Sequence, residues 1–247
     1  MKTIVYLILI LSSITASYSQ DAYTIIKKTD EHSRGNTSIA TMSIQVIRPT
    51  WSRTITMKAW TKGNEYSAIL IQSPVKEKGT VFLKRIKEVW NWIPSIERTI
   101  KMPPSMMNQS WMGTDFSTDD LVKEASILKD YTHTIIGDTT IEGRNCYIIQ
   151  LIPKPGSAIV WGKVITMIDK KDYILMNVRY YDEAGILVNT LRCTDIKNFN
   201  GRLLPATMEM IPTDKQKHKT VMTYSDIIFN TTIPDSFFSI NNITQVK

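Results

Sequence analysis

The sequence contains few of the residues that most often carry catalysis. Among 247 residues there are two cysteines and three histidines, and His32, His133 and His218 all lie in polar or turn-like surroundings. No Gly-x-Ser-x-Gly, His-Glu-x-x-His or Cys-x-x-Cys motif occurs. Because no nucleophile, base and orienting group can be assembled, the sequence argues against an enzyme. It predicts no catalytic residue, no metal ligand and no cofactor.

The two cysteines allow one disulfide at most. Cys146 and Cys193 both fall in expected strands that about two other strands separate. Non-adjacent strands lie roughly 10 Å or more apart, which is too far for a disulfide. We therefore expect two buried free thiols, unless the sheet curls enough to bring the cysteines together.

The only long apolar run lies at the N-terminus. Lys2 is followed by the apolar residues 4–11 and by Ser17-Tyr18-Ser19 ahead of Gln20. This is the pattern of a secretory signal peptide, and its apolar part is too short to span a bilayer. With no cysteine near the cleavage site, a lipid anchor is not expected. The sequence predicts a signal peptide at 1–19, a single domain at 20–247 and export of the protein.

The charge is mildly basic, at +7 for the whole chain. The charged residues are scattered and form no basic stripe, which argues against binding to nucleic acid. An anionic membrane surface or an acidic partner remains open, although a small surplus of charge is usually a solubility feature.

The spacing of apolar residues predicts a mainly β protein with a few helices. Residues 23–33 have helical spacing, and Gly35-Asn36 ends that helix. Alternating runs bounded by turn residues then fill 41–102 and 146–228. A meander of about 11 antiparallel strands cannot stay flat. We expect a strongly curved antiparallel sheet whose concave face is covered by helices.

A short amphipathic helix is expected where the strands are interrupted. Ser117 and Asp120 form a capping box, and residues 121, 122, 125 and 128 form an apolar stripe behind it. Asp119 and Asp120 point in different directions on a helix, so they are interpreted as residues that stabilise its N-terminus and not as a catalytic pair.

The segment 88–112 is the most informative part of the chain. Trp90 and Trp92 occupy alternate positions of one expected strand, so their side chains fall on the same face. A methionine-rich loop bounded by prolines follows. An alternating tryptophan strand is most often plain core, but large apolar side chains in a loop are costly unless they cover something. Methionine suits variable apolar contacts. We therefore predict an apolar chamber with a movable cover, whose candidate lining residues are Trp90, Trp92, Ile96, Met102, Met106, Met107, Trp111, Met112, Leu121, Val122 and Ala125.

Nearly all of the chain after residue 19 resembles the outer-membrane lipoprotein-sorting proteins, the LolA-like group of periplasmic carriers. The similar segments are RPTWSRTITMKAW (48–60), PVKEKGTVFLK (74–84), VWNWIPSIERTIKMPPSMMNQSWMG (89–113), DFSTDDLVKE (115–124), VWGKV (160–164), MEMIP (208–212) and IPDSFFS (233–239). The resemblance implies an incomplete, unclosed LolA/LolB-like antiparallel β-barrel in the periplasm that carries lipoprotein acyl chains toward the outer membrane. It also implies that the candidate lining residues between 90 and 125 bind those acyl chains. It also implies a monomer that receives cargo from an inner-membrane exporter and passes it to an outer-membrane acceptor.

The chain departs from the best-studied carriers in one respect. There, an Arg-Pro pair ahead of the Trp-containing strand helps to hold the lid shut. Here Ser73-Pro74 occupies that place, and Arg48-Pro49 lies one or more strands earlier. The lid mechanism is therefore not expected to transfer. The alternative function is an envelope lipid sensor, or a partner-binding domain, that uses the same cavity without transport.

Overall fold

The computed structural model describes residues 21–246 except 124–126, 158 and 160. The expected signal peptide at 1–19 lies outside these residues. Within the described part of the chain, no helix is long and apolar enough to cross a membrane.

The N-terminal helix α1 (Ala22–Arg34) matches the expected helix closely. The Asp21 side chain accepts a hydrogen bond from the backbone N–H of Thr24 at 2.6 Å, which caps the first turn. Gly35 ends the helix with φ of 65°, a conformation that glycine adopts without steric cost. Ala22, Ile25 and Ile26 form its buried face.

The described strands form one antiparallel sheet of 13 strands. Their bounds are β1 (Thr37–Ile47), β2 (Ser52–Lys62), β3 (Tyr66–Ser73), β4 (Val81–Arg85), β5 (Glu88–Ile93), β6 (Arg98–Met102), β7 (Tyr131–Ile141), β8 (Arg144–Pro153), β9 (Lys163–Asp169), β10 (Leu175–Tyr181), β11 (Leu187–Phe199), β12 (Arg202–Pro212) and β13 (Lys219–Phe229). The fold is therefore mainly β, as predicted.

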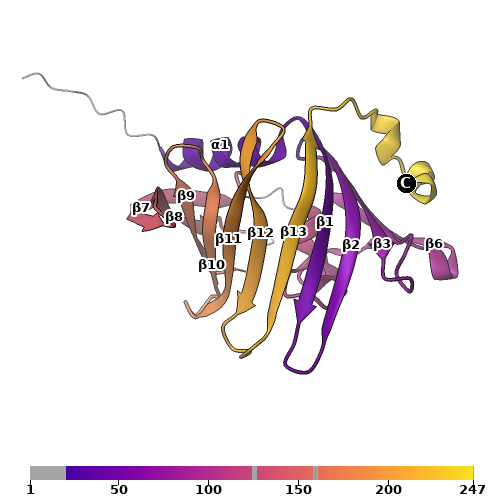
Figure 1. The fold of residues 1–247 in the computed structure, drawn as a ribbon, viewed down its shortest axis with the longest axis horizontal. Helices are drawn as coiled ribbons and strands as arrows, with labels where there is room; N and C mark the ends of the chain where they lie inside the picture. Colours follow the sequence, from indigo (N-terminus) through magenta and orange to yellow (C-terminus); the bar gives the residue numbers. More distant parts are fainter. Residues whose placement is uncertain (1–20, 124–126, 158, 160, 247) are drawn as a thin grey trace, which may run out of the picture.

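The strand order runs β6-β5-β4-β3-β2-β1-β13-β12-β11-β10-β9-β8-β7. The first and last strands of the chain pair with each other in the middle of the sheet, and β6 and β7 form its two unpaired edges (Figure 1). The prediction of an unclosed antiparallel barrel is confirmed. The opening lies between β6 and β7, where the interruption in the strand pattern had been recognised.

The strand β7 was not expected from the sequence. Its exposed positions alternate with half-buried ones, and Gly137 interrupts the register with β8. An edge strand of this kind, rich in threonine and bearing His133, buries too little apolar surface to give a clear alternating pattern. With this strand the described sheet has 13 strands, compared with the predicted number of about 11.

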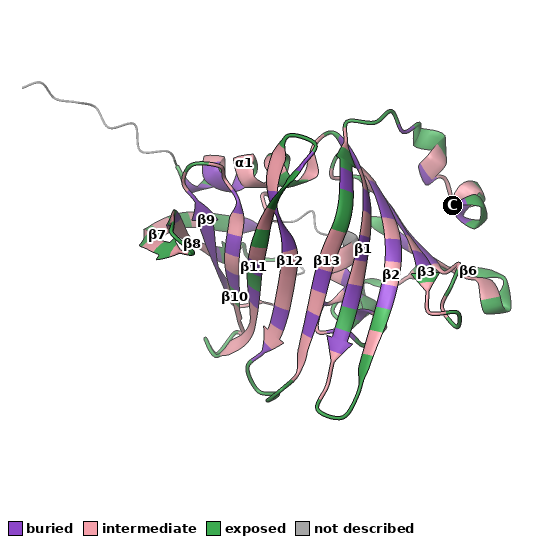
Figure 2. Cartoon of the chain, in the orientation of Figure 1, coloured by how far each residue is buried: buried purple, intermediate pink, exposed green. Residues whose placement is uncertain are grey.

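Different segments pack against the two faces of the sheet, and Figure 2 shows buried positions alternating with half-buried or exposed ones along its strands. The inner face packs against α1 and the 103–123 segment in the largest apolar cluster. That segment, which we call the inner cover, contains η2 (Pro104–Met106), η3 (Trp111–Gly113) and the π-helical turn η4 (Asp119–Lys123). The outer face of β2–β5 packs against the chain end 231–246, the outer cover, with η5 (Asp235–Phe238) and η6 (Ile240–Gln245).

Both cysteines are buried and free. Cys146 lies in β8 and Cys193 in β11, with two strands between them, as the sequence indicated. Burial raises the pKa of Cys193 to about 12, so its thiol stays protonated and unreactive at neutral pH.

Candidate functional site

The inner face of the sheet encloses a cavity of about 380 Å³, a size typical of small-ligand sites. Its wall is made by side chains from α1, from most of the strands and from the inner cover. Most of the wall is apolar, because inward-facing positions of successive strands carry aliphatic residues and methionine. These include Met42, Met57, Ile69, Leu151, Val164, Ile168, Val178, Leu191, Met208, Met222 and Ile227.

Trp111 anchors the inner cover to the sheet. Its side chain is 1% exposed and packs on Phe82 of β4 with the ring centroids 5.4 Å apart. Met107 and Phe116 are buried beside it in the same cluster. The indole N–H of Trp111 has no acceptor among the described residues. A buried donor without an acceptor costs free energy. The contact of Trp111 with the sheet is therefore apolar packing that leaves one hydrogen-bond donor unsatisfied.

Arg48 and Asp115 fasten the inner cover to the ends of β1 and β13. The guanidinium nitrogens Nη1 and Nη2 donate to the two carboxylate oxygens of Asp115 at 2.9 and 3.1 Å. Arg48 also donates to the carbonyl of Gly113 at 3.1 Å, and the Thr220 hydroxyl donates to Asp115 at 2.7 Å. The side chains of Arg48 and Asp115 are only 11% and 7% exposed. We call this set the Arg48 latch.

A second arginine binds the same cover. Arg53 of β2 donates to the carbonyl of Met112 and forms an ion pair with Glu77 at 3.6 Å. The sequence placed Arg48 one or more strands earlier than the position of the family's lid arginine and did not connect it with the cover. In the structure the turn between β1 and β2 brings Arg48 directly onto the inner cover.

The predicted capping box is present at the start of η4. The backbone N–H of Ser117 donates to the Asp120 carboxylate at 2.8 Å, and the N–H of Asp120 donates to the Ser117 hydroxyl at 3.1 Å. Loss of solvent raises the pKa of Asp120, and the hydrogen bonds to Ser117 oppose that rise. Burial also raises the pKa of Tyr131, with the nearby charges of Asp119 and Asp120 adding to the effect. Asp119, Asp120 and Tyr131 all line the cavity.

The expected position of Trp90 and Trp92 on the cavity wall is wrong. The alternation was recognised correctly, but both indoles lie on the outer face, in the cluster formed with the outer cover. The register explains this, because Trp90 faces Leu83 and Trp92 faces Val81, which point outward. The inward positions of β5 are Val89 and Asn91.

The remaining predicted residues divide into four groups. Leu121 lines the cavity. Met107 and Trp111 are buried in the inner cluster, and Met102 and Met112 pack against it. Ile96 and Met106 are 53% and 39% exposed and contribute nothing to the cavity wall. Ala125 lies outside the described residues, as does the placement of the Val122 side chain.

Most of the cavity wall was missed by sequence reasoning. Wall residues such as Met57, Leu151 and Val178 are scattered along the chain, one or two in each strand. Each sits at an ordinary inward position, which sequence alone cannot separate from solid core. The helix α1 supplies further wall residues, among them Ile26, Asp30 and Arg34.

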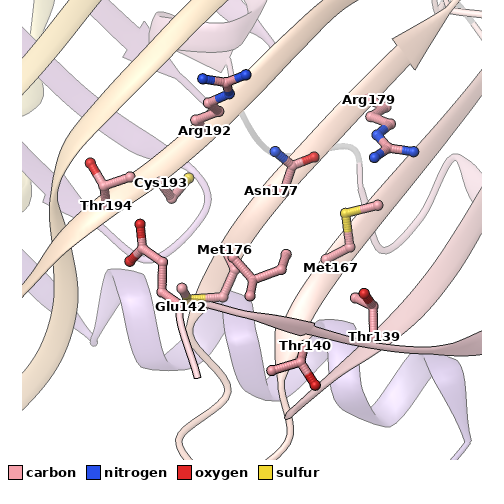
Figure 3. A pocket seen from close by; sticks show the side chains of 11 residues that line it. Thr139, Thr140, Glu142, Met167, Met176, Asn177, Arg179, Arg192, Cys193 and Thr194 are labelled. Atoms are coloured by element: carbon pink, nitrogen blue, oxygen red, sulfur yellow. The ribbon is translucent and has the colours of Figure 1, made fainter. Parts of the chain in front are cut away.

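A second pocket of about 360 Å³ lies where the end of the β7–β8 hairpin crosses β9–β11 (Figure 3). Arg179 and Arg192 border it, Asn177 lies between them, and Met167 and Met176 lie deeper. Both arginines are exposed and therefore solvated. Among the described residues no group of three or more His, Cys, Asp or Glu side chains is arranged to hold a metal ion.

The comparisons with known proteins agree with this architecture. A family model described as an uncharacterized protein matches residues 63–245, most of the chain. No curated protein matches. A DUF1329 family protein from Desulfovibrio piger is 20% identical, with a TM-score of 0.82 over 90% of this chain and 97% of that one.

Two further solved structures carry the names expected from the sequence. A putative outer membrane lipoprotein-sorting protein domain from Vibrio parahaemolyticus has a TM-score of 0.81 at 21% identity, over 90% of this chain and 98% of that one. A LolA superfamily protein from Nitrosomonas europaea has a TM-score of 0.77 at 21% identity, over 90% and 99%. The chain therefore belongs to the family of uncharacterized proteins that this model defines, and its fold is that of the LolA-like lipoprotein-sorting proteins.

Proposed function

We propose that the protein is a periplasmic carrier that holds the acyl chains of a lipoprotein or a similar lipid in the inner cavity and moves them toward the outer membrane. The observation that supports this most is the apolar cavity enclosed between the concave sheet, α1 and the inner cover. A signal peptide at 1–19 and an inner-membrane donor and outer-membrane acceptor belong to the same proposal. Catalysis is no part of it.

The physical case rests on the cost of exposing an acyl chain to water. That cost is about 0.8 kcal/mol for each CH2 group, so a long chain needs a sheltered path between membranes. The aliphatic and methionine side chains of the cavity wall supply that shelter. Release requires a cover that competes with the cargo for the same surface. The inner cover suits this role, because methionine makes adaptable contacts and the Trp111 N–H lacks an acceptor among the described residues.

A cavity-filling substitution tests the proposal. Ala59 of β2 lines the cavity, and Ala59→Phe fills part of it. The matched control is Gln45→Phe, which adds the same ring at an exposed position of the neighbouring strand β1. We expect Ala59→Phe to weaken the binding of a fluorescent acyl-chain probe at least tenfold and Gln45→Phe to leave it unchanged. Equal binding by both variants would contradict the proposed site.

The cargo itself is identified by native mass spectrometry with lipid extraction, on the protein purified from its own periplasm. Co-purifying acylated peptide or lipoprotein supports sorting. Free lipid that changes the affinity for a protein partner, without transfer to acceptor vesicles, supports the alternative of an envelope lipid sensor with the same cavity. A protein that stays empty after incubation with lipoprotein argues against both.

A further inference from the structure

Three turns lie next to one another along the edge of the sheet that carries the Arg48 latch. They comprise residues 48–51, between β1 and β2, residues 74–80, between β3 and β4, and residues 213–218, between β12 and β13. Because β4, β3, β2, β1, β13 and β12 are consecutive neighbours in the sheet, these turns follow one another along its edge. Figure 1 shows the β1–β2 and β12–β13 turns side by side at the lower edge of the sheet. We call the three turns the basic edge.

Side-chain contacts join the three turns into one surface. Arg53, near the start of β2, forms an ion pair with Glu77 of the second turn at 3.6 Å. Arg48 of the first turn donates to the backbone carbonyl of Lys219, the residue that follows the third turn, at 3.2 Å. The basic edge is therefore continuous across the turns.

Two large apolar side chains project from the basic edge. Val75 is 89% exposed, the highest value among the large apolar side chains of the described residues, and Trp51 is 51% exposed. The guanidinium carbon of Arg48 lies 5.9 Å from the centroid of the Trp51 ring, so the indole stands beside the latch while half of it remains open to water. Single exposed apolar residues are common on soluble proteins. Two of them on adjacent turns, one a tryptophan, match the residues that enter the interface of a bilayer, where an indole ring is favoured.

The exposed charge of the basic edge is mainly positive. Its acidic residues are Glu77, which pairs with Arg53, and the exposed Asp214. The next turn along the same edge, at 182–186, carries two acidic residues and no lysine, so the positive charge is confined to the basic edge. Four exposed lysines supply this charge: Lys76, Lys78, Lys215 and Lys217.

We infer that the basic edge docks on the surface of a bilayer that contains anionic phospholipids. Trp51 and Val75 enter the interface, and the four lysines face the lipid phosphates. Apolar insertion and electrostatic attraction add to one another in interfacial binding, and two apolar side chains give a contact that is weak enough to be reversible. The inference goes beyond the proposed function, in which membrane proteins deliver and receive the cargo. It does not require cargo in the cavity.

Charge and area favour a bilayer over a second copy of this chain as the occupant. Two copies that met through the basic edge would bring their lysines together, and like charges at an interface are unfavourable. The phosphates of an anionic bilayer attract the same lysines. Two exposed apolar side chains also supply well below the surface of about 800 Å² that each partner buries in a stable protein interface.

Vesicle co-sedimentation tests the inference with the exported protein. The vesicles consist of phosphatidylcholine alone, or of phosphatidylcholine and phosphatidylglycerol in equal amounts. We expect binding to the mixed vesicles to be at least about tenfold tighter than binding to the neutral ones, and to weaken as salt screens the charges. Equal binding to both kinds of vesicle, or no binding to either, would overturn the inference.

The variant Trp51→Ser/Val75→Ser removes both apolar side chains and leaves the lysines in place. We expect it to bind the mixed vesicles at least about tenfold more weakly, because less apolar area enters the interface. If the double variant fails to fold, Val75→Ser alone replaces it, since that side chain is almost fully exposed. The single variant should weaken binding about threefold. Binding at the wild-type affinity would overturn the inference.

The matched control is Ile86→Ser/Ile228→Ser. These isoleucines are 56% and 43% exposed. They lie toward the opposite edge of the sheet, Ile86 between β4 and β5 and Ile228 opposite Ile39 near the start of β1. The control should bind the mixed vesicles as the wild type does, and a loss equal to that of Trp51→Ser/Val75→Ser would overturn the inference.

A charge variant tests the lysines separately. Changing all four of them to glutamine keeps the turns polar and removes the positive charge. We expect this variant to bind neutral and mixed vesicles equally, because the attraction to phosphatidylglycerol is lost. A preference for the mixed vesicles that survives in it would overturn the inference.

The cavity-filling variant separates this inference from the proposed function. Ala59→Phe should bind the mixed vesicles as the wild type does while it loses affinity for the acyl probe. Vesicle binding that falls in Ala59→Phe would mean that the cavity takes up the lipid, and it would overturn the inference. Vesicle binding by a wild type that binds no acyl probe supports the inference and overturns the proposed function. Self-association of the wild type that Trp51→Ser/Val75→Ser abolishes would assign the basic edge to a second copy of the chain and overturn the inference.

Discussion

The same part of the sheet, β3–β5, is covered on both faces, and the two covers are held in different ways. The outer cover is fixed by apolar packing. Phe238 is fully buried, its ring centroid lies 5.6 Å from that of Tyr66, and the Phe237 ring lies 5.3 Å from that of Trp60. The described polar contacts to the strands come from Lys62, which donates to Asp235 and to the carbonyl of Ile233, and from the Thr37 hydroxyl, which donates to the carbonyl of Thr231 at 2.7 Å.

The inner cover combines apolar packing with buried ionic contacts. Trp111 packs on Phe82, while Arg48 and Asp115 form a bidentate pair that is nearly closed to solvent. Apolar packing of the outer kind makes a permanent core, whereas a buried ion pair holds one geometry and fails when one partner is lost. The inner cover is therefore the one whose attachment depends on charged contacts, and under the proposed function it is the cover that is released.

The largest expected effect concerns the outer cover. Phe238→Ala should lower the free energy of unfolding by about 3–5 kcal/mol, as for other large-to-small changes in a core. Acyl-probe affinity should stay the same, since Phe238 lies on the face opposite the cavity. Denaturant unfolding and probe titration check this. The half-buried Phe237 is the control, and a cost for Phe238→Ala below that for Phe237→Ala would contradict the packing described.

A slightly smaller effect is expected at the Arg48 latch. Asp115→Ala leaves a buried guanidinium without its carboxylate and should cost about 3 kcal/mol, at the lower end for broken buried pairs. The cost is limited because Arg48 keeps the carbonyls of Ile47, Gly113 and Lys219 as acceptors. Unlike Phe238→Ala, it should also speed the release of an acyl probe, measured by stopped-flow displacement.

The double variant Arg48→Met/Asp115→Ala serves as the control for the latch. Removing both charges should restore most of the lost stability while release of the probe stays fast. If the single variant released the probe at the wild-type rate, the latch would be structural only, and the contrast between the two covers would disappear.

The fold could be predicted from the sequence to a large extent, because strand alternation and turn residues are local signals. The helix α1 and the segments up to β6 lie close to where they were expected. Trp90 and Trp92 show the limit of this reasoning. Alternation tells which residues share a face, but a strand packed on both sides carries large apolar residues on both, and only the register with Leu83 and Val81 shows which face is outward.

The candidate site was harder to predict because it depends on contacts between distant segments. Arg48 and Asp115 are 67 positions apart, and nothing local to either residue indicates their pairing. Lys84 lines the cavity from β4, but nothing in the sequence indicates that it points inward, because a lysine near the end of a strand usually points into solvent. By contrast, Met107 and Trp111 were recognised as a cover, since large apolar residues in a loop have to be buried against something.

A pH effect is expected at the inner cover. Burial holds the pKa of Asp120 above its usual value, so the folded state binds this proton more tightly than the unfolded state. The stability that the proton contributes is complete below the unfolded pKa and is lost as the pH rises through the folded pKa. Asp120→Asn should therefore gain stability relative to the wild type as the pH rises above about 4, the usual range of a carboxyl pKa. Unfolding curves measured at a series of pH values check this prediction. A difference in the free energy of unfolding between the variant and the wild type that stays constant, or that falls as the pH rises, would refute it.

The smallest effect is expected at the salt bridge of the outer cover. The Lys62 Nζ and Asp235 Oδ1 atoms lie 2.5 Å apart, but the two side chains are 37% and 70% exposed. Asp235→Ala should therefore cost less than about 1 kcal/mol, and the cost should shrink in high salt. Double-mutant analysis with Lys62→Ala isolates the pair from the hydrogen bond of Lys62 to Ile233. A coupling as large as that of Arg48 and Asp115 would mean that both covers depend on charge. A small coupling energy would mean that the apolar packing of Phe238 and its neighbours holds the outer cover, in contrast to the inner cover with its Arg48 latch.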